Sequence, residues 1–492
     1  MSDSATTPHL PTGSTRTIMI VVLLVCNVLA CFLEMLMNIA LDHIATQYDI
    51  RLSLANWVVL GFAIVNATAI TTAASLLRRF GIRKIMLTGC LFALTGSLLG
   101  FFATSFPLIV VARLIQAVTT GLFFPVVNEA LFTLSPKGKA GILLSANSAV
   151  CGFAFALTPP VAGLVLTYGG LKLLFLVPAA CALVLGVVCY FTLHNIYARV
   201  KRKIDIPSLV LSFVGLGAFM CGLNEVAHDP LPSIALMLFG AAMIAVFVRR
   251  QLRISTPLLD LKPFKYQVFS LGETLIMIAY MGSLFVSLVV PLYLEGVQGE
   301  TPFIAGCLLS IPICTYATLC IVSGKVLSKR GIWPLVSCGF GLAVLGFSLV
   351  YGGVSLGNIV LVLVFTALAY GGIGLAYPSV KSVDFEAVPQ TLSSHASSIH
   401  STLVQIAGSI GTALFVGIMS GQMEHLTAAG ASRATAYASG FEITLGIIIG
   451  IIAVGFVLSF WYSRIVRKKK HLRTCYSEEL VIQSIAYGSD DE

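Results

Sequence analysis

Apolar runs long enough to cross a lipid bilayer recur from one end of this 492-residue chain to the other. A spanning helix needs about 20 mostly apolar residues, and about fourteen runs meet that length. Only 10% of the residues are charged, against about a quarter in a soluble globular protein. The sequence therefore predicts an all-α, polytopic membrane protein. The runs are 18-41, 54-77, 85-104, 107-132, 141-166, 173-194, 207-226, 232-248, 269-294, 303-327, 333-354, 357-379, 396-420 and 438-463.

The seventh and eighth runs are short and loosely bounded, and without them the count would be twelve. Five regions follow from the spacing of the runs. They are a cytoplasmic N-terminal tail (1-17), an N-terminal six-helix bundle (18-194), a linker with two extra transmembrane helices (195-268), a C-terminal six-helix bundle (269-463) and a cytoplasmic tail (464-492).

Most of the 30 lysines and arginines fall in loops on one side of the predicted membrane. Short loops rich in Lys and Arg stay in the cytoplasm, so the pattern predicts cytoplasmic termini and a multi-pass protein of the cell (inner) membrane. The net charge of +9 then reflects topology rather than a nucleic-acid partner. We expect the basic tail at 464–473 to contact anionic membrane lipids.

A short repeat supports two related halves. Residues 74–81 close the second run and residues 324–331 close the tenth. Each segment opens with a small residue, Ala74 or Gly324, carries paired bases and ends in a glycine, Gly81 or Gly331. Internal repeats of this kind are typical of transporters whose halves rock about a central site.

Glu34 is a carboxylate deep inside the first apolar run, where an ionisable group is costly and marks a functional site by default. Asn27, Cys31 and Asn38 lie at helical spacing from it, so the four residues share one face of the predicted helix. That face should point into protein or water rather than lipid.

Arg113 in the fourth run lies at the same predicted depth as Glu34, about 10 Å below the extracellular boundary. Gln116 and Thr120 extend its helix face. Attraction between the two charges favours ionised Glu34, whereas burial favours its protonated form. Two interpretations stand: Glu34 alternates between these forms during transport and attracts a cationic substrate, or Glu34 and Arg113 form a permanent structural ion pair.

Other titratable residues near the membrane have simpler interpretations. Five acids fall near the ends of runs, where a side chain reaches water, and a solvated boundary position is favoured for each. Two histidines near the start of the thirteenth run titrate near neutral pH but have no partner at recognisable spacing, so polar helix-face positions are favoured. The acids are Glu129, Glu225, Glu273, Glu295 and Glu442, and the histidines are His395 and His400.

Several motifs carry a resemblance to a known family. Residues 33–41 resemble the first-helix pattern L-D-x-T-x-x-N-x-A-L, with Glu34 in place of Asp, and residues 113–117 resemble the fourth-helix pattern R-x-x-Q-G. The chain thereby resembles the major facilitator superfamily, and within it the fourteen-helix drug/proton antiporters of the EmrB and QacA type. Further matching segments are 57–59, the turn at Gly81 to Lys84 with Arg83, residues 158–163, 291–294, 305–312 and 405–411.

The resemblance implies two six-helix bundles with an inserted pair, and a monomeric unit that uses the proton gradient rather than a cofactor or metal to expel amphipathic or cationic compounds. Two departures bear on gating. Arg78 stands where the family has an aspartate that steadies the outward-facing state, so that latch is altered or absent. Thr158 replaces a glycine of the fifth-helix motif, in which Pro159, Pro160 and Gly163 predict a kinked helix packed against a neighbour.

A secondary transporter is therefore the preferred function, and no enzyme activity is expected. The chain has no G-x-x-x-x-G-K-[ST] phosphate loop for ATP and no nucleophile or metal cluster for an intramembrane enzyme. The closest alternative is an exporter or importer of one endogenous metabolite, and a non-transporting membrane sensor is a further alternative.

Overall fold

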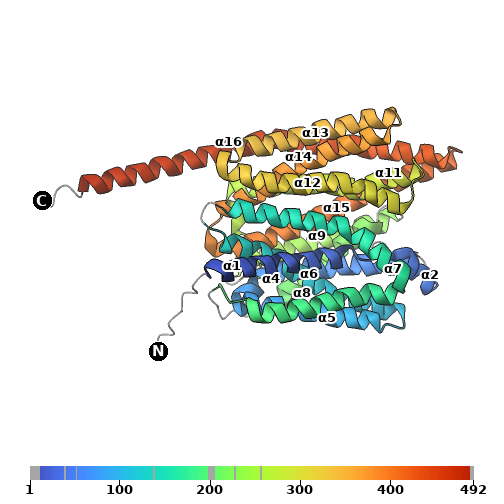
Figure 1. Ribbon diagram of the computed structural model, residues 1–492, viewed down its shortest axis with the longest axis horizontal. Coiled ribbons are helices and arrows are strands. Elements are labelled where there is room, and N and C mark those ends of the chain that lie inside the picture. The colour runs from blue at the N-terminus through green and yellow to red at the C-terminus, as the bar shows by residue number, and fades with distance from the viewer. Residues whose placement is uncertain are drawn as a thin grey trace.

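The structure, a computed structural model, describes residues 11–37, 40–50, 52–136, 139–197, 205–225, 229–254 and 257–487. In these ranges all regular structure is helical (Figure 1). The helices are α1 Gly13–Met35, α2 Leu41–Gln47, α3 Leu52–Ala55, α4 Trp57–Phe80, α5 Ile82–Phe101, α6 Phe106–Leu134, α7 Ala140–Thr192, α8 Ile206–Glu225, α9 Pro230–Arg253, α10 Gln267–Leu284, α11 Val290–Gly296, α12 Pro302–Arg330, α13 Trp333–Ser355, α14 Ile359–Ala387, α15 Ser393–Ala428 and α16 Arg433–Tyr487. Three short segments of other helix types are η1 Lys262–Lys265, η2 Phe285–Val289 and η3 Gln390–Leu392.

The predicted number of spans is confirmed for the described chain. Thirteen of its helices are long and apolar enough to cross a membrane. One of them, α7, contains non-helical backbone at Gly170 with φ 60°, which divides it into the predicted fifth and sixth spans. Because α8 and α9 are both present as long helices, the count is fourteen rather than twelve.

The first span differs from its predicted limits of 18-41. Helix α1 begins at Gly13 and ends at Met35, and a separate helix α2 begins at Leu41. Glu34 therefore lies in the last turn of α1 rather than in a continuous span. The carbonyl groups of a last helical turn lack partners within the helix, so they are available to accept hydrogen bonds from other helices.

Two groups of helices face each other. We call α1 and α4–α7 the N-terminal half, and α10–α16 the C-terminal half. Helix α7 packs against α12 and α14, and α15 packs against α4 and α6. The α8–α9 pair contacts both halves, because α8 packs against α4 and α15.

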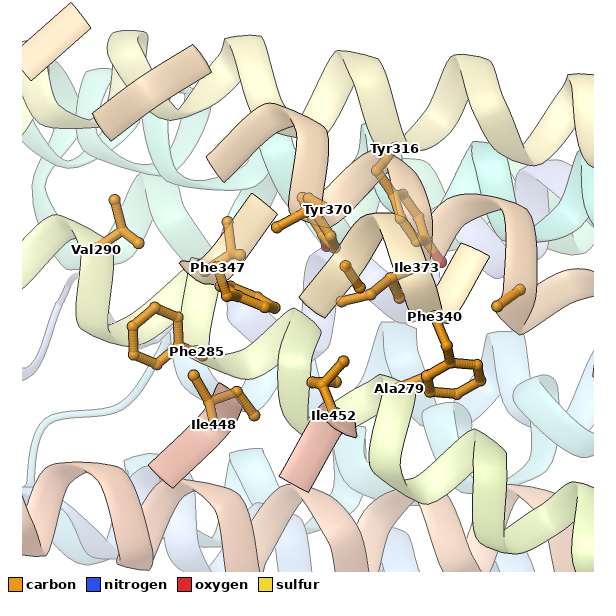
Figure 2. Packing of buried hydrophobic residues seen from close by; sticks show 14 of the residues in the cluster. Ala279, Phe285, Val290, Tyr316, Phe340, Phe347, Tyr370, Ile373, Ile448 and Ile452 are labelled. Atoms are coloured by element: carbon orange, nitrogen blue, oxygen red, sulfur yellow. The ribbon is translucent and has the colours of Figure 1, made fainter. Parts of the chain in front are cut away.

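Aromatic rings fill much of the core of the C-terminal half. Phe285 is fully buried, and its ring centroid lies 5.4 Å from that of Phe347 and 5.9 Å from that of Phe415. Figure 2 shows Phe285 and Phe347 beside Ile448, with Tyr316, Tyr370 and Ile373 farther along the same cluster. Inside a bilayer, such rings stabilise the bundle through close van der Waals packing rather than through removal of apolar surface from water.

The predicted tight turn after the second helix of each half is present. Gly81 ends α4 with φ 80° and Gly331 ends α12 with φ 79°, a backbone conformation that glycine adopts without a Cβ penalty. The two amide groups donate to equivalent carbonyls four residues back, Leu77 O and Leu327 O. The sequence repeat is thus also a repeat of backbone geometry.

Both ends of the chain lie on the same side of the molecule, at the left of Figure 1, where α16 projects beyond the bundle. The Arg16 guanidinium near the start of α1 donates to the Leu134 carbonyl at the end of α6. The ends of α4 and α12 belong to this side because the helices alternate in direction. We call it the terminal face.

Candidate functional site

Glu34 lies in the last turn of α1, partly buried, where the two halves meet. Its carboxylate interacts electrostatically with Arg113 on α6 and with Tyr280 on α10 of the C-terminal half. Of its predicted helix-face companions, Asn27 and Cys31 are buried, whereas Asn38 lies outside the described residues. These two companions therefore face protein rather than lipid, and the role of this helix face stays a prediction.

Arg113 is fully buried but does not contact Glu34 directly. No ion pair within 4.0 Å joins these two described residues. Arg113 Nη1 instead donates to Leu33 O at 2.9 Å and to Gln116 Oε1 at 2.8 Å. Leu33 O is one of the carbonyls that the end of α1 leaves free, so Arg113 caps α1 and its cation sits at the negative end of the helix. The permanent direct ion pair is therefore not present in this arrangement.

The rest of the Arg113 guanidinium is in contact with a ring rather than with acceptors. Its Cζ lies 4.1 Å from the centroid of Phe62 on α4, a cation–π contact. Nε and Nη2 are buried without a hydrogen-bond partner among the described residues. A buried cation with two unused donors is costly, and a negative charge nearby, such as ionised Glu34, lowers that cost.

Gln116 and Thr120 are buried on the Arg113 face of α6, as predicted. Gln116 Nε2 donates to Ser97 Oγ on α5 at 2.8 Å, so the amide holds Arg113 on one side and α5 on the other. The hydroxyl of Thr120 donates to Ala117 O in its own helix. Gln116 therefore positions Arg113, and Thr120 satisfies its hydrogen bond locally.

A line of amides runs from α1 into the C-terminal half. Asn27 Nδ2 donates to Asn147 Oδ1 at 2.9 Å, and Asn147 Nδ2 donates to Asn128 Oδ1 at 2.9 Å. Lys381 on α14 donates to the same Asn128 oxygen at 2.8 Å. The line joins α1, α7, α6 and α14, and Lys381 is only 4% exposed. The sequence analysis did not predict Asn128, Asn147 or Lys381 as site residues. The signal available for the two asparagines was a polar side chain inside an apolar run.

At the terminal face, Arg78 at the end of α4 contacts the start of α15. Its Nε donates to Ser394 Oγ at 2.9 Å, and its Nη2 donates to the carbonyls of Gln390 and Thr391 in η3. The N-terminal end of α15 carries a partial positive charge, which repels a cation. The cation avoids that end by binding the carbonyl oxygens just before it.

Glu129 on α6 takes the position at the α15 N-terminus instead. Its Oε1 accepts from Ser393 Oγ at 2.6 Å, and Ser393 is the first residue of α15. A carboxylate at a helix N-terminus is stabilised by the helix dipole. Arg78, Glu129 and the η3 carbonyls border a cavity of about 240 Å³. The two halves are thus in contact at the terminal face.

The predicted solvated positions are wrong for two of the five acids. Glu129 and Glu273 are each 1% exposed, because helices from elsewhere in the chain cover them and supply partners. Glu273 Oε2 lies 3.1 Å from His400 Nδ1. Glu225 and Glu295 are exposed and Glu442 is partly exposed, as expected of boundary positions.

The two histidines are also buried with partners rather than simple helix-face residues. His400 on α15 contacts Glu273 on α10, and its Nε2 lies 3.4 Å from the Tyr377 hydroxyl. His395 Nδ1 accepts from the Asp260 amide at 3.1 Å. All three partners lie more than 20 residues away in sequence, so spacing along a helix could not reveal them.

The turn between α4 and α5, which carries Gly81 and Arg83, packs against the end of α7 and the residues that follow it. At Gly81 a Cβ would lie 2.2 Å from Asn195 Oδ1, and that oxygen accepts from the Ile82 amide at the start of α5. Arg83 donates to Tyr190 O and stacks on the Tyr190 ring. The turn after α4 is therefore fastened to the end of α7.

Glycines at the interface between halves have two different surroundings. A Cβ at Gly324 on α12 would lie 2.9 Å from Ser145 Cβ on α7, so the two helices approach closely there. A Cβ at Gly163 or Gly331 would have nothing within 4 Å. Helix α7 stays helical through Pro159 and Pro160, and its break is at Gly170. Close approach at Gly163 was expected and is not observed.

The described residues contain no group of three or more His, Cys, Asp or Glu side chains arranged to hold a metal ion. Among the described residues, buried His400 is paired with Glu273, and the buried cations Arg113 and Lys381 are hydrogen-bonded to side-chain amides or a backbone carbonyl.

Comparison with known proteins gives a family match over most of the chain. A model of the Major Facilitator Superfamily matches residues 23–412. The uncharacterized MFS-type transporter YcnB of Bacillus subtilis is 26% identical over 90% of this chain and 94% of its own. The lincomycin resistance protein LmrB of Listeria innocua is 28% identical over 82% of this chain and 87% of its own. The riboflavin transporter RibZ of Clostridioides difficile is 21% identical over 87% and 93%.

Among solved structures, the proton:xylose symporter XylE bound to 6-bromo-6-deoxy-D-glucose superposes with a TM-score of 0.62. The match covers 89% of this chain and 94% of that chain at 14% identity. A likeness at this identity concerns the fold alone.

Proposed function

Because the chain belongs to the major facilitator superfamily of transporters, we propose that it is a secondary active transporter that expels amphipathic, often cationic compounds in exchange for protons. The terminal face is the cytoplasmic face of the cell membrane in this proposal. Within the superfamily, we assign the chain to the fourteen-helix drug/proton antiporters as part of this proposal.

One observation carries the proposal: Glu34 lies between the halves, close to a buried cation that it does not contact directly. Arg113 is fixed by Leu33 O and Gln116, so the attraction on Glu34 does not depend on a direct pair. A carboxylate in this setting gains from Arg113 when ionised and loses from burial. Its proton is therefore exchangeable when water or a cation reaches it.

In alternating access, the site between the halves opens first to one side of the membrane and then to the other, so the solvent exposure of Glu34 changes. With Arg78 and Glu129 in contact with η3 and α15, the terminal face is closed between the halves. Separation of α4 and α6 from α15 would open it. Glu34 would then meet the cytoplasm in one arrangement and the outside in the other, so that cation binding and proton binding compete at one carboxylate.

The test uses inside-out membrane vesicles that carry a proton gradient and a fluorescent lipophilic cation. Wild type is expected to accumulate the cation, and a protonophore is expected to abolish the accumulation. Glu34→Gln should lose accumulation against a gradient, because its neutral amide cannot exchange a proton. Glu225→Gln, at an exposed acid on α8, is the matched control and should behave as wild type. Accumulation by Glu34→Gln with unchanged pH dependence would falsify the coupling role.

A transporter of one endogenous metabolite is the second candidate. The relative RibZ carries the name of a riboflavin transporter and aligns with 87% of this chain. Buried polar groups such as Gln116 and Asn147 suit a hydrogen-bonded substrate. Vesicles that take up riboflavin or another single metabolite, but no lipophilic cation, would favour this candidate.

A further inference from the structure

A separate set of ionisable side chains is buried within the C-terminal half. It consists of Glu273 on α10, Asp384 on α14 and His400 on α15, and we call these three residues the C-half cluster. Their exposed fractions are 1%, 0% and 2%. His400 Nδ1 lies 3.1 Å from Glu273 Oε2. The coupling role of Glu34 does not involve any of them.

The Asp384 carboxylate reaches the α10 backbone beside Glu273 because residue 272 has no side chain. Gly272 precedes Glu273 on α10, and a Cβ built there would lie 2.0 Å from both carboxylate oxygens of Asp384. Asp384 therefore packs onto the α10 backbone next to Glu273, and the two carboxylates interact electrostatically. Two adjacent carboxylates in a protein interior do not both ionise readily, since each charge opposes the other.

Asp384 lacks the hydrogen bonds that an ionised carboxylate needs. The Tyr462 hydroxyl on α16 donates to Oδ1 at 2.8 Å. Oδ2 is buried and has no hydrogen-bond partner in the part of the chain that the structure describes. An ionised carboxylate offers about four acceptor positions, and burying it with one donor is strongly unfavourable. A proton on Oδ2 removes the charge that is poorly solvated.

The positive charge nearby is engaged elsewhere. Lys381 Nζ donates to Asn128 Oδ1 on α6 and acts on Glu273 and His400 only at longer range. The ammonium group thus acts on Glu273 while it is hydrogen-bonded to α6, and the His400 imidazole contacts both Glu273 and Tyr377. Tyr377 interacts electrostatically with Glu273, and Tyr462 interacts with both Asp384 and Glu273. Glu386 acts on Tyr462, and Cys151 of α7 and Cys320 of α12 act on Lys381.

We propose that the C-half cluster is a second proton-binding site, which holds a proton on Asp384 while the halves are closed at the terminal face. The proton comes from water, bonds to a carboxylate oxygen of Asp384, and returns to water. No other reactant takes part. The ligand of this site is therefore a proton.

The cluster is connected to the interface between the halves through α14. Lys381 is hydrogen-bonded to α6, and Phe385, next to Asp384, packs its ring against Phe132 of α6 with 5.9 Å between centroids. Separation of the halves breaks both contacts and admits water from the terminal face. The site then exchanges its proton with that compartment. Its part in coupled efflux rests on the proposed function, whereas proton binding itself does not.

Infrared difference spectroscopy of the full-length protein in lipid nanodiscs, recorded across a pH series, tests the site without transport. Wild type is expected to show the carbonyl stretch of a protonated, buried carboxylic acid. Asp384→Asn should lose that band. Tyr462→Phe should shift it, because Oδ1 loses its hydrogen bond. Glu34→Gln and Glu225→Gln should keep it.

The outcomes separate this proposal from the proposed function. Identical carboxylic-acid bands in wild type and Asp384→Asn at every pH overturn the site. If Asp384→Asn does not fold, an unshifted band in Tyr462→Phe overturns it instead. If the carboxylic-acid band of Asp384 is present but efflux does not depend on the proton gradient, the result supports the site and contradicts the proposed antiport. Proton-driven efflux without the band contradicts the site alone.

Discussion

Lys381 Nζ on α14 lies 2.8 Å from Asn128 Oδ1 on α6, and this hydrogen bond joins the two halves of the molecule through buried side chains. The same Asn128 oxygen accepts from Asn147, which in turn accepts from Asn27 of α1. A buried ammonium group on one half is thus solvated by an amide of the other. This arrangement favours the closed terminal face, because separation removes the acceptor.

Asn128→Leu should destabilise the protein by about 1.5–3 kcal/mol, the usual loss for a hydrogen bond to a charged group. The double variant Asn128→Leu with Lys381→Met should recover much of that loss, since no unpaired charge stays buried. Thermal unfolding midpoints in detergent measure both. Lys325→Met, at an exposed lysine of α12, serves as the control. Additive losses in the double variant would show that the two residues are not coupled.

Arg78→Asp should shift the conformational balance towards an open terminal face. Arg78 now donates hydrogen bonds to the carbonyls of η3 and interacts electrostatically with the Glu129 carboxylate. An aspartate in its place would put a negative charge beside these oxygens. Like charges in such positions repel. Distances between spin labels at the ends of α4 and α15 measure the change, and the long-distance population should grow at least severalfold.

Arg79→Ala is the matched control for that experiment, because the Arg79 guanidinium lies over the Phe80 ring of its own helix. Its distance distribution should match wild type. If Arg78→Asp also leaves the distribution unchanged, Arg78 does not hold the halves together.

The sequence predicts the number of helices and the repeat well, because both depend on local patterns. Apolar length defines a span, and the glycines at 81 and 331 mark a tight turn. The end of α1 at Met35 was not predictable in the same way, since residues 36–41 are as apolar as the helix before them. The end of α1 is capped by Arg113, which lies on another helix and donates to Leu33 O.

The sequence predicts the C-half cluster poorly, for a physical reason. Its contacts join residues far apart in sequence: Glu273 and His400 are 127 positions apart, and Asp384 and Tyr462 are 78 positions apart. Asp384 and Lys381 fall just beyond the predicted end of the twelfth span at 379, whereas α14 continues to Ala387. An apolar run ends where polar residues begin, but a helix buried on all sides continues when those residues find partners.

Gly272→Ala should be among the most damaging glycine replacements in the chain. Its Cβ would lie 2.0 Å from Asp384 Oδ1 and Oδ2, so the carboxylate must leave its position on α10. Overpacking of this kind costs about 1–3 kcal/mol, occasionally more. Gly306→Ala, in α12 with nothing within 4 Å of the added Cβ, is the control and should be neutral. Thermal unfolding compares the two, and equal midpoints would contradict the packing of Asp384 against α10.

Asp205 and Arg250 form an ion pair at the membrane boundary of the α8–α9 pair, with Arg250 Nη2 3.0 Å from Asp205 Oδ1. Hydrogen bonds from Arg250 hold the pKa of Asp205 below its usual value. A carboxyl whose folded pKa is lowered adds stability above its unfolded pKa and loses it as pH falls through the folded value. Wild type should therefore exceed Asp205→Asn in stability at neutral pH by up to about 1 kcal/mol. The difference should vanish in acid and shrink in high salt, and a pH-independent difference would contradict it.

The two repeat glycines allow a comparison within one chain. Gly81→Ala and Gly331→Ala place a Cβ on backbones of nearly equal φ and extended ψ, 80° and 162° at Gly81 and 79° and −174° at Gly331. Only glycine readily adopts this conformation, so each variant loses about 1–3 kcal/mol. Only the Cβ at residue 81 also collides with a neighbour, Asn195 Oδ1 at 2.2 Å, and it displaces the oxygen that caps the Ile82 amide. Gly81→Ala should therefore have the lower unfolding midpoint and the lower transport rate. Equal effects would mean that the Asn195 contact does not fasten the turn after α4 to the end of α7.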